Sequence, residues 1–240
     1  MLVLSADGSY TAYSKEYDEH YHSTKDGALS ESLNKHIIPA FKLQSHKKTL
    51  NILDICFGLG FNTLATLYYA KKIGYRGVVN IYSPELDERL LLSLKDFIYP
   101  KELEPFKSIL YSLVEDGLYR DDSVNIELFV GDAREYIKGL KDIDIVYQDA
   151  FSPKTNPMLW TQEYFSDIKK LIKNDGIITT YSTALATRLA LYQNLFKIFL
   201  NQGESFRNAT IASLSKIDGF KEVDMAHKLK CNPDAKALRD

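Results

Sequence analysis

The chain has 240 residues, 45% of them apolar, so it is long enough for one large α/β domain and has enough apolar side chains to fill a core. This composition excludes disordered and fibrous proteins. Lys and Arg number 30 against 32 Asp and Glu, and the net charge of −2 excludes a protein that coats nucleic acid through bulk charge.

From about Leu50, short β-branched or aromatic runs alternate with longer amphipathic runs, which is typical of a mostly parallel sheet wrapped by helices. The predicted strands are Leu50–Phe57, Val78–Glu85, Ile126–Gly131, Ile143–Asp149 and Gly176–Ser182, with Ala209–Leu214 as a returning antiparallel strand. The predicted helices are Asn62–Ile73, Leu86–Ile98, Ala133–Leu140, Thr161–Lys173 and Ala184–Phe199. The less regular stretch 100–125 is predicted to be an inserted helix and loop.

This pattern predicts three parts. Residues 1–49 form a Tyr-rich segment that we expect to pack on the active site, residues 50–214 form the α/β domain, and residues 215–240 form a polar tail.

The chain shows no sign of a membrane, secretion or metal function. The longest uncharged stretch, Ile55–Ala70, is shorter than the ~20 residues that cross a bilayer. The N-terminus has no basic region of a signal peptide, so we expect a cytoplasmic protein. Cys56 and Cys231 lie far apart, and His20 and His22 have no third ligand nearby in the sequence. We therefore expect neither a disulfide scaffold nor a metal site.

The predicted strand Leu50–Phe57 runs into Gly58-Leu59-Gly60 and then a helix that begins near Asn62. Glycines there allow close approach to a ligand, and the first amides of the helix can hold an anionic group. The same pattern also fits an ordinary strand-to-helix turn. Thr63 stands where a dinucleotide fingerprint has Gly or Ala, which disfavours NAD and FAD.

Acids end the next two strands. Glu85 can accept hydrogen bonds from both hydroxyls of a ribose, or can cap the following helix. Asp132 can accept from an adenine amino group, or can likewise be a helix cap. Because carboxyl ends of parallel strands meet at one edge, these acids are expected to face the same crevice as Gly58.

The fourth strand carries the most informative acid. Asp149 is followed by Phe151 and Pro153, so a carboxylate lies beside an aromatic side chain at the end of a central strand. Such a pair can bind an amine or a planar base and take up a proton. A turn-forming Asp before Pro153 is the alternative. We favour the functional interpretation because of the other strand-end residues.

These motifs resemble the methyltransferase module of the MnmC-type tRNA (5-methylaminomethyl-2-thiouridine) enzymes. The resemblance covers roughly residues 7 to 214. It rests on the turn 57–62, on Glu85, on Gly131-Asp132, and above all on Asp149-Ala150-Phe151-Ser152-Pro153 followed by Asn156-Pro157-Met158-Leu159-Trp160-Thr161. The strand 179–182 follows in the same order, and Tyr21-His22-Ser23 with Gly27 and Glu31 is similar to the family's N-terminal segment.

The resemblance implies an α/β fold of the class I S-adenosyl-L-methionine (SAM)-dependent methyltransferases, with a Rossmann-like seven-stranded sheet and a reversed final hairpin. It implies methylation of the exocyclic amine of 5-aminomethyl(-2-thio)uridine at the tRNA wobble position. The partner is then a tRNA anticodon loop. The FAD oxidase domain of the bifunctional relatives has no counterpart in this sequence, so other enzymes of the wobble-uridine pathway are expected to supply the amine.

The resemblance also implies roles for individual residues. The SAM-binding set is Asp54, Gly58, Gly60, Asn62, Glu85, Asp132 and Asp149. The catalytic pair is Asp149, which orients the amine and helps its proton leave, and Phe151, which faces the target base. The substrate-binding set is Tyr21, Glu31, Pro153, Lys154 and Trp160. One departure is the last hairpin, which is basic in the family but here has only Arg207 between Gly203 and Thr210.

Two alternatives stay open from the sequence. An aminopropyltransferase of the spermidine synthase type shares the fold, the glycine turn and an amine-handling aspartate, but uses decarboxylated SAM. A non-catalytic RNA-binding protein could keep the fold and lose the chemistry, although the intact acids Glu85, Asp132 and Asp149 disfavour it.

Overall fold

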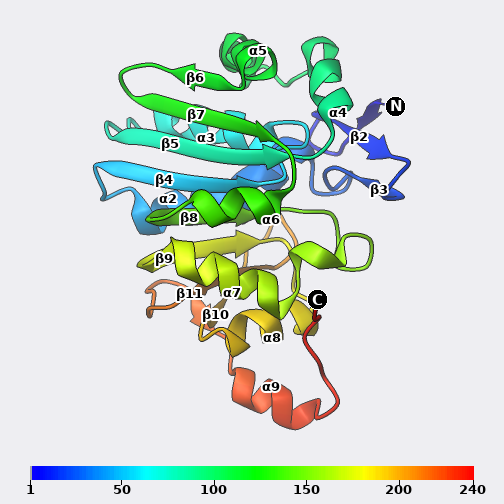
Figure 1. Ribbon diagram of the computed structural model, residues 1–240, viewed down its shortest axis with the longest axis vertical. Coiled ribbons are helices and arrows are strands. Elements are labelled where there is room, and N and C mark those ends of the chain that lie inside the picture. Colours follow the sequence, from blue (N-terminus) through cyan, green and yellow to red (C-terminus); the bar gives the residue numbers. More distant parts are fainter. Residues whose placement is uncertain (1) are drawn as a thin grey trace.

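A computed structural model describes residues 2–240, and within this range the chain forms one small and one large sheet (Figure 1). The small antiparallel sheet consists of β1 (Leu2–Leu4), β2 (Tyr10–Ser14) and β3 (Glu19–His20). The large sheet consists of β4 (Thr49–Ile55), β5 (Val78–Glu85), β6 (Leu118–Arg120), β7 (Val124–Val130), β8 (Ile143–Gln148), β9 (Ile172–Thr180), β10 (Lys197–Asn201), β11 (Ala209–Ser213) and β12 (Lys221–Glu222).

Most helices connect these strands. They are α1 (Ala28–Glu31), the π-helix η1 (Ser32–Ile37), α2 (Ile38–Gln44), α3 (Phe61–Lys72), α4 (Glu88–Ser93), α5 (Lys107–Asp116), α6 (Ala133–Tyr136), α7 (Gln162–Leu171), α8 (Leu185–Gln193) and α9 (Met225–Cys231). Short 3₁₀ turns are η2 (Leu94–Asp96), η3 (Glu104–Phe106), η4 (Ile137–Gly139) and η5 (Pro157–Leu159).

The order across the large sheet is β12-β10-β11-β9-β8-β4-β5-β7-β6. The five central strands from β9 to β7 are parallel, whereas β11 runs antiparallel to both β9 and β10. The expected α/β class with a mostly parallel sheet is therefore confirmed. The expected count of seven strands is wrong for residues 2–240, because the short strands β6 and β12 extend the two edges to nine.

The five central strand predictions each overlap an observed strand, but the last predicted helix is too long. α8 ends at Gln193, and Lys197–Asn201 forms β10 instead of continuing the helix to Phe199. Leu195 has a φ of 72°, which no helix accommodates. The turn contains neither Gly nor Pro, so the apolar pattern runs through it without a break.

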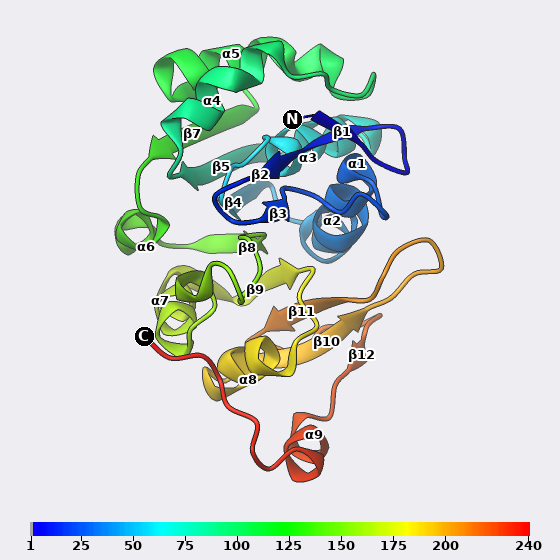
Figure 2. The same cartoon turned by 90° about the vertical axis from the view of Figure 1, so that its right-hand side faces the viewer.

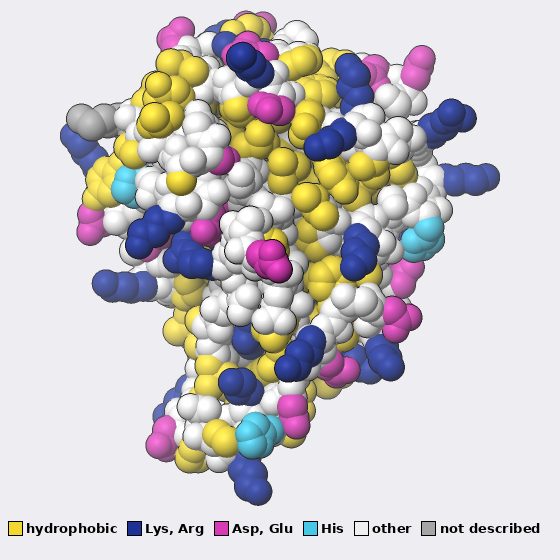
Figure 3. Space-filling model, turned by 180° about the vertical axis from the view of Figure 1, so that it is seen from behind, with side chains coloured by type: hydrophobic (Ala, Val, Ile, Leu, Met, Phe, Trp, Pro, Cys, Tyr) yellow, Lys and Arg dark blue, Asp and Glu magenta, His cyan; other side chains and the backbone are white. Residues whose placement is uncertain are grey.

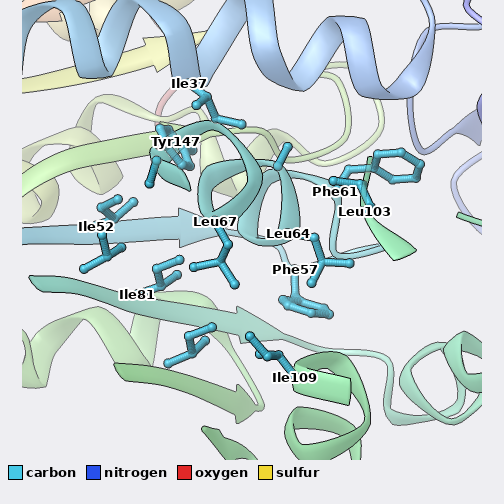
Figure 4. Packing of buried hydrophobic residues seen from close by; sticks show 14 of the residues in the cluster. Ile37, Ile52, Phe57, Phe61, Leu64, Leu67, Ile81, Leu103, Ile109 and Tyr147 are labelled. Atoms are coloured by element: carbon cyan, nitrogen blue, oxygen red, sulfur yellow. The ribbon is translucent and has the colours of Figure 1, made fainter. Parts of the chain in front are cut away.

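The core has two apolar clusters, one on each face of the large sheet. Along β4, Ile52 packs into the first cluster and Leu53 into the second, as the alternation of a strand requires. Figure 4 shows part of the first cluster: Leu64 and Leu67 of α3 lie between the strands and the helix, and Phe61 lies at the far end beside Leu103. Helices α6, α7 and α8 contribute side chains to the second cluster.

The N-terminal sheet lies at the carboxyl edge of the large sheet, on the right of Figure 1 and toward the viewer in Figure 2. β4 has β5 on one side and β8 on the other, so the chain order reverses beside β4. Ligands of open α/β sheets bind outside the carboxyl ends at such a reversal. On the face that lies behind the view of Figure 1, basic and acidic side chains are interspersed around apolar ones (Figure 3).

Candidate functional site

A cavity of about 860 Å³ opens where the carboxyl ends of the central strands meet the N-terminal segment. Eight residues singled out in the sequence line it: Tyr21, Glu31, Gly58, Asn62, Glu85, Asp132, Asp149 and Phe151. They come from positions spread over more than half of the chain, and the topology of the parallel sheet brings them together.

The glycine turn forms one wall of the cavity. Gly58 has a φ of 55° and Gly60, at the start of α3, a φ of 75°, which favour glycine at both positions. A Cβ on Gly60 would lie 3.0 Å from the Phe57 ring, so Gly60 supports the turn from behind and is not among the residues that line the cavity. Gly58 lines it and has the Tyr21 ring as its neighbour.

Glu85 anchors the adjacent loop. Its Oε2 accepts a hydrogen bond from the Gly58 amide at 2.8 Å, and its Oε1 accepts from the amides of Leu86 and Asp87, each at 2.9 Å. Burial raises the pKa of Glu85, although these three amides act in the opposite direction. The carboxylate therefore holds two loops together at the cavity wall.

Asp132 begins α6 and lines the cavity as well. Its Oδ1 accepts a hydrogen bond from the Arg134 amide at 2.7 Å, which is the capping role that the sequence left open. Capping uses one carboxylate oxygen and leaves acceptor capacity on the other. The structure is thus compatible with both interpretations of this acid.

Asp149 follows β8, and its carboxylate is nearly buried, with a side-chain exposure of 8%. Asn62 Nδ2 donates to Oδ2 at 2.8 Å, and His36 Nε2 lies 3.3 Å from Oδ1. Burial raises the pKa of Asp149, but His36, His22 and Asn62 outweigh burial and hold the pKa below its ordinary value. A carboxylate whose pKa is held low in a concave site has the chemistry to bind a cation.

The sequence did not point to His36, which lies on the π-helix η1. It is fully buried, and its Nδ1 lies 3.0 Å from the Thr179 hydroxyl on β9. Thr179 is 143 residues away in the chain, so sequence spacing carries no signal for this contact. His22, which was considered as a metal ligand from the sequence, lines the cavity, and its Nδ1 lies 3.8 Å from Glu31 Oε2. Burial lowers the pKa of His22.

Glu31 belongs to an ion-pair network at the mouth of the cavity. Lys35 Nζ lies 2.7 Å from Glu31 Oε1 and 2.6 Å from Asp26 Oδ2, and all three side chains are largely buried. Glu31 Oε2 also accepts from the Ser23 amide at 2.6 Å. Arg207, the single basic residue of the last hairpin, lies 3.4 Å from Asp26 Oδ2 and lines the cavity. The network fixes the segment from Ser23 to Asp26 beside the opening.

Aromatic side chains form a further part of the cavity wall, next to Gly58. The Phe151 ring stacks on Tyr17, with centroids 4.4 Å apart, and lies 5.0 Å from the Tyr21 ring. Burial, together with the charge of Glu85, raises the pKa of Tyr21 to about 12. Glu19 Oε2 accepts from the Ser152 amide at 3.0 Å, and its Oε1 accepts from the Ser152 hydroxyl. These contacts attach the N-terminal hairpin to the loop after β8.

The remaining predicted residues lie outside the cavity lining. Asp54 is fully buried below the glycine turn, where it accepts from the Thr63 hydroxyl at 2.8 Å, and burial raises its pKa to about 7. Trp160 is fully buried and donates from Nε1 to the Phe151 carbonyl at 2.8 Å, so it supports the loop. Pro153 is half-buried and Lys154 is exposed.

Within residues 2–240, no cluster of His, Cys, Asp and Glu has the arrangement of a metal site. No helix in the described part of the chain is both long and apolar enough to cross a membrane.

Comparisons with known proteins agree on one family. A family model described as S-adenosyl-L-methionine-dependent methyltransferase matches residues 106–215. The crystal structure of MNMC2 from Aquifex aeolicus superposes with a TM-score of 0.88 at 34% identity, over all of this chain and 78% of that one.

Two relatives in sequence are longer than this chain. The uncharacterized protein MJ0670 of Methanocaldococcus jannaschii is 37% identical over 80% of this chain and 52% of its own length. The bifunctional protein MnmC of Pseudoalteromonas atlantica, named for tRNA 5-methylaminomethyl-2-thiouridine biosynthesis, is 24% identical over 89% of this chain and 33% of its own length. The chain therefore spans about half and about a third of these relatives. The likenesses confirm the class I methyltransferase fold inferred from the motifs.

Proposed function

The chain belongs to the MnmC2-type family of SAM-dependent methyltransferases, and from this premise we propose that it methylates the exocyclic amine of 5-aminomethyluridine at the wobble position of tRNA. The observation that carries the proposal is the ionised, nearly buried Asp149 beside Phe151 in the cavity. Such a site binds a cationic amine attached to a planar base.

The residues at one side of the cavity fit SAM. Glu85 can accept from ribose hydroxyls, Asp132 from an adenine amino group, and the turn at Gly58 allows a ligand to approach the backbone closely. Asp54 and Gly60 support this wall from behind, and Asn62 links it to Asp149. When bound, SAM supplies a methyl group on a sulfonium. The residues of the cavity bind it and exclude water.

Asp149 is proposed to orient the amine. An aminomethyl group, like Lys, is largely protonated near neutral pH, so the reaction needs the free base with its lone pair aimed at the methyl group. An ionised Asp149 accepts a hydrogen bond from one N–H of the amine and stabilises the positive charge that develops on nitrogen. Because its pKa is held low, Asp149 passes the proton of the bound ammonium on to solvent and does not keep it, so the amine reacts as the free base.

The rest of the cavity is proposed to hold the base. Phe151 offers a stacking surface, with Tyr21 beside it, and Trp160 and Pro153 shape the loop that carries Phe151. A wobble uridine lies in a single-stranded loop, where splaying a base costs little. Glu31 and Lys154 are proposed to act at the opening. We also propose that residues 1–49 form one side of the active site, that the protein works in the cytoplasm, and that other enzymes supply the aminomethyl group.

The direct test is methyl transfer in vitro from methyl-labelled SAM to tRNA that carries 5-aminomethyluridine. The matched control is the same tRNA with an unmodified wobble uridine. Nucleoside mass spectrometry is expected to find 5-methylaminomethyluridine in the first tRNA alone. Label at another nucleoside, or none at all, would contradict the proposal.

The same assay distinguishes the proposal from the two alternatives, because neither alternative transfers a methyl group to tRNA. The comparisons do not favour these alternatives. An aminopropyltransferase would act on putrescine with decarboxylated SAM. A non-catalytic RNA-binding protein would bind the tRNA and leave both substrates unchanged.

A further inference from the structure

His36 contacts Asp149 from the side away from the cavity. It is not among the residues that line the cavity. Its side chain is completely buried, between the π-helix η1 and strands β8 and β9. One ring nitrogen meets Thr179 Oγ1 at 3.0 Å, and the other lies 3.3 Å from Asp149 Oδ1. The ring edge also packs on Tyr147, with centroids 5.8 Å apart. Each side of the imidazole therefore has a defined neighbour.

These neighbours determine which ring nitrogen carries a proton. An ionised carboxylate only accepts hydrogen bonds, so we assign the ring proton to Nε2, which lies within ion-pair distance of Asp149 Oδ1. Nδ1 can then accept a hydrogen bond from the Thr179 hydroxyl. The three side chains are thus arranged in series: Thr179 contacts His36 Nδ1, and His36 Nε2 contacts Oδ1 of the Asp149 carboxylate. Asn62 holds the other oxygen at 2.8 Å.

The local backbone is consistent with a functional purpose. Residues 32–37 form a π-helix between two α-helical segments, and such insertions concentrate at functional sites. The wider turn changes the helical phase, which sets the face on which His36 lies.

We propose that His36 is a positioning residue for amine methylation: it holds Asp149 Oδ1 so that the carboxylate presents its free lone pairs to the substrate amine. This inference rests on the proposed function and adds a residue to it. A freely rotating Asp149 would still attract the cation, but would orient its lone pair less well.

Removal of the imidazole also changes the charge environment. The titratable groups that face Asp149 or His36 from the neighbouring elements are His22, Asp54, Cys56, Tyr147 and Tyr181, with Glu31 beyond His22. Burial and the charge of Asp54 disfavour ionisation of Asp149, whereas His22 and His36 favour it. Without His36, Asp149 becomes easier to protonate, so the acidic limb of the pH–rate profile moves to higher pH.

The experiment compares three variants with wild type. His36→Phe fills the space and removes the donor, His36→Gln restores an N–H near the position of Nε2, and Thr179→Val removes the partner of Nδ1. Thr180→Val is the matched control, because Thr180 is equally buried on β9 but its side chain alternates to the opposite face.

We expect His36→Phe to lower kcat by roughly tenfold to a hundredfold with little change in KM or SAM affinity. The acidic limb of the pH–rate profile of His36→Phe moves to higher pH. His36→Gln recovers most of the rate, and Thr179→Val lowers kcat less than His36→Phe does. Thr180→Val keeps the wild-type profile. A purely structural role would instead lower the melting temperature of His36→Phe and leave its pH profile unmoved.

A second readout does not depend on turnover. The carboxyl ¹³C resonance of Asp149, assigned by its loss in Asp149→Asn, reports the protonation of this group directly. The inference requires a higher pKa of Asp149 in His36→Phe than in wild type, and an unchanged titration overturns it. If wild type fails to methylate the tRNA but this resonance still shifts, the proposed substrate is wrong and the pairing of His36 with Asp149 stands.

Discussion

At Asp149 two different side chains hold the two carboxylate oxygens, Asn62 at Oδ2 and His36 at Oδ1. The carboxylate thereby stays ionised and fixed in direction. The same acid begins the loop that leads from β8 to Phe151. A single residue thus joins the wall proposed for SAM, through Asn62, to the side proposed for the base.

Asp149→Asn is expected to keep the fold and most of the SAM affinity, while the methylation rate falls by roughly 10² to 10⁴. The amide still accepts a hydrogen bond but no longer stabilises positive charge on the amine. The deficit should shrink as pH rises, because more of the substrate arrives as free amine. A pH–rate profile on aminomethyl-bearing tRNA measures this, and a variant with the wild-type profile would remove Asp149 from the chemistry.

Glu85→Ala should weaken SAM binding by about tenfold to a hundredfold, since hydrogen bonds to a charged group contribute roughly 1.5–3 kcal/mol. The loss also includes ordering of the turn, because three amides lose their acceptor. Calorimetry with SAM measures it. Glu88→Ala, three residues on and exposed, is the control. Equal affinities in wild type and Glu85→Ala would show that Glu85 does not contact the cofactor.

At the scale of elements, the loop after β8 and the hairpin from β2 to β3 form one wall through Phe151, Tyr17 and the Glu19–Ser152 contacts. Neither element builds this wall alone. The loop is supported from below, where Trp160 donates to the Phe151 carbonyl. A base that enters beside Phe151 therefore meets a surface with little freedom to move.

Phe151→Ala should raise KM for tRNA by about tenfold to a hundredfold, because stacking of an aromatic side chain on a base contributes roughly 1–3 kcal/mol. SAM affinity should be unchanged. Phe129→Ala is a matched control, since Phe129 also stacks on a tyrosine, with a centroid distance of 4.7 Å to Tyr136, but lies outside the cavity lining. Equal KM values for both variants would exclude base stacking at Phe151.

The sequence predicted this site only in part, for a physical reason. Gly58, Glu85 and Asp149 follow apolar strands directly, so the parallel sheet itself predicts that they meet. His36 and Tyr17 reach the site through contacts that span more than a hundred residues. No local pattern encodes such contacts. The end of α8 was missed because the turn there, at Asn194 and Leu195, contains neither Gly nor Pro, and its positive φ falls on an apolar residue.

At the scale of the whole molecule, the sheet carries a buried carboxyl whose ionisation affects stability. Asp54 is fully buried within the strand β4 and is hydrogen-bonded to Thr63, and within residues 2–240 it has no cationic partner such as the lysines that pair with the buried Asp144. Burial raises its pKa from 3.8 to about 7. The folded state therefore binds a proton that the unfolded state releases, and stability falls as pH rises from about 4 to about 7.

Asp54→Asn should remove this dependence. Relative to wild type, the variant should gain about 2–3 kcal/mol in the free energy of unfolding between pH 5 and pH 8, from 1.36 kcal/mol per pK unit. Urea unfolding of the ligand-free protein at both pH values measures the difference. Asp122→Asn, at an exposed carboxyl, should follow wild type. A constant difference between Asp54→Asn and wild type would mean that Asp54 is ionised throughout.

The central claim is that this protein converts 5-aminomethyluridine to 5-methylaminomethyluridine in tRNA. The most direct measurement is mass spectrometry of tRNA nucleosides from cells that lack the protein, with the wild-type or the Asp149→Asn gene returned to them. We predict that 5-aminomethyluridine accumulates in the deletion strain, disappears with the wild-type gene and persists with the variant. Unchanged wobble nucleosides in the deletion strain would contradict the claim.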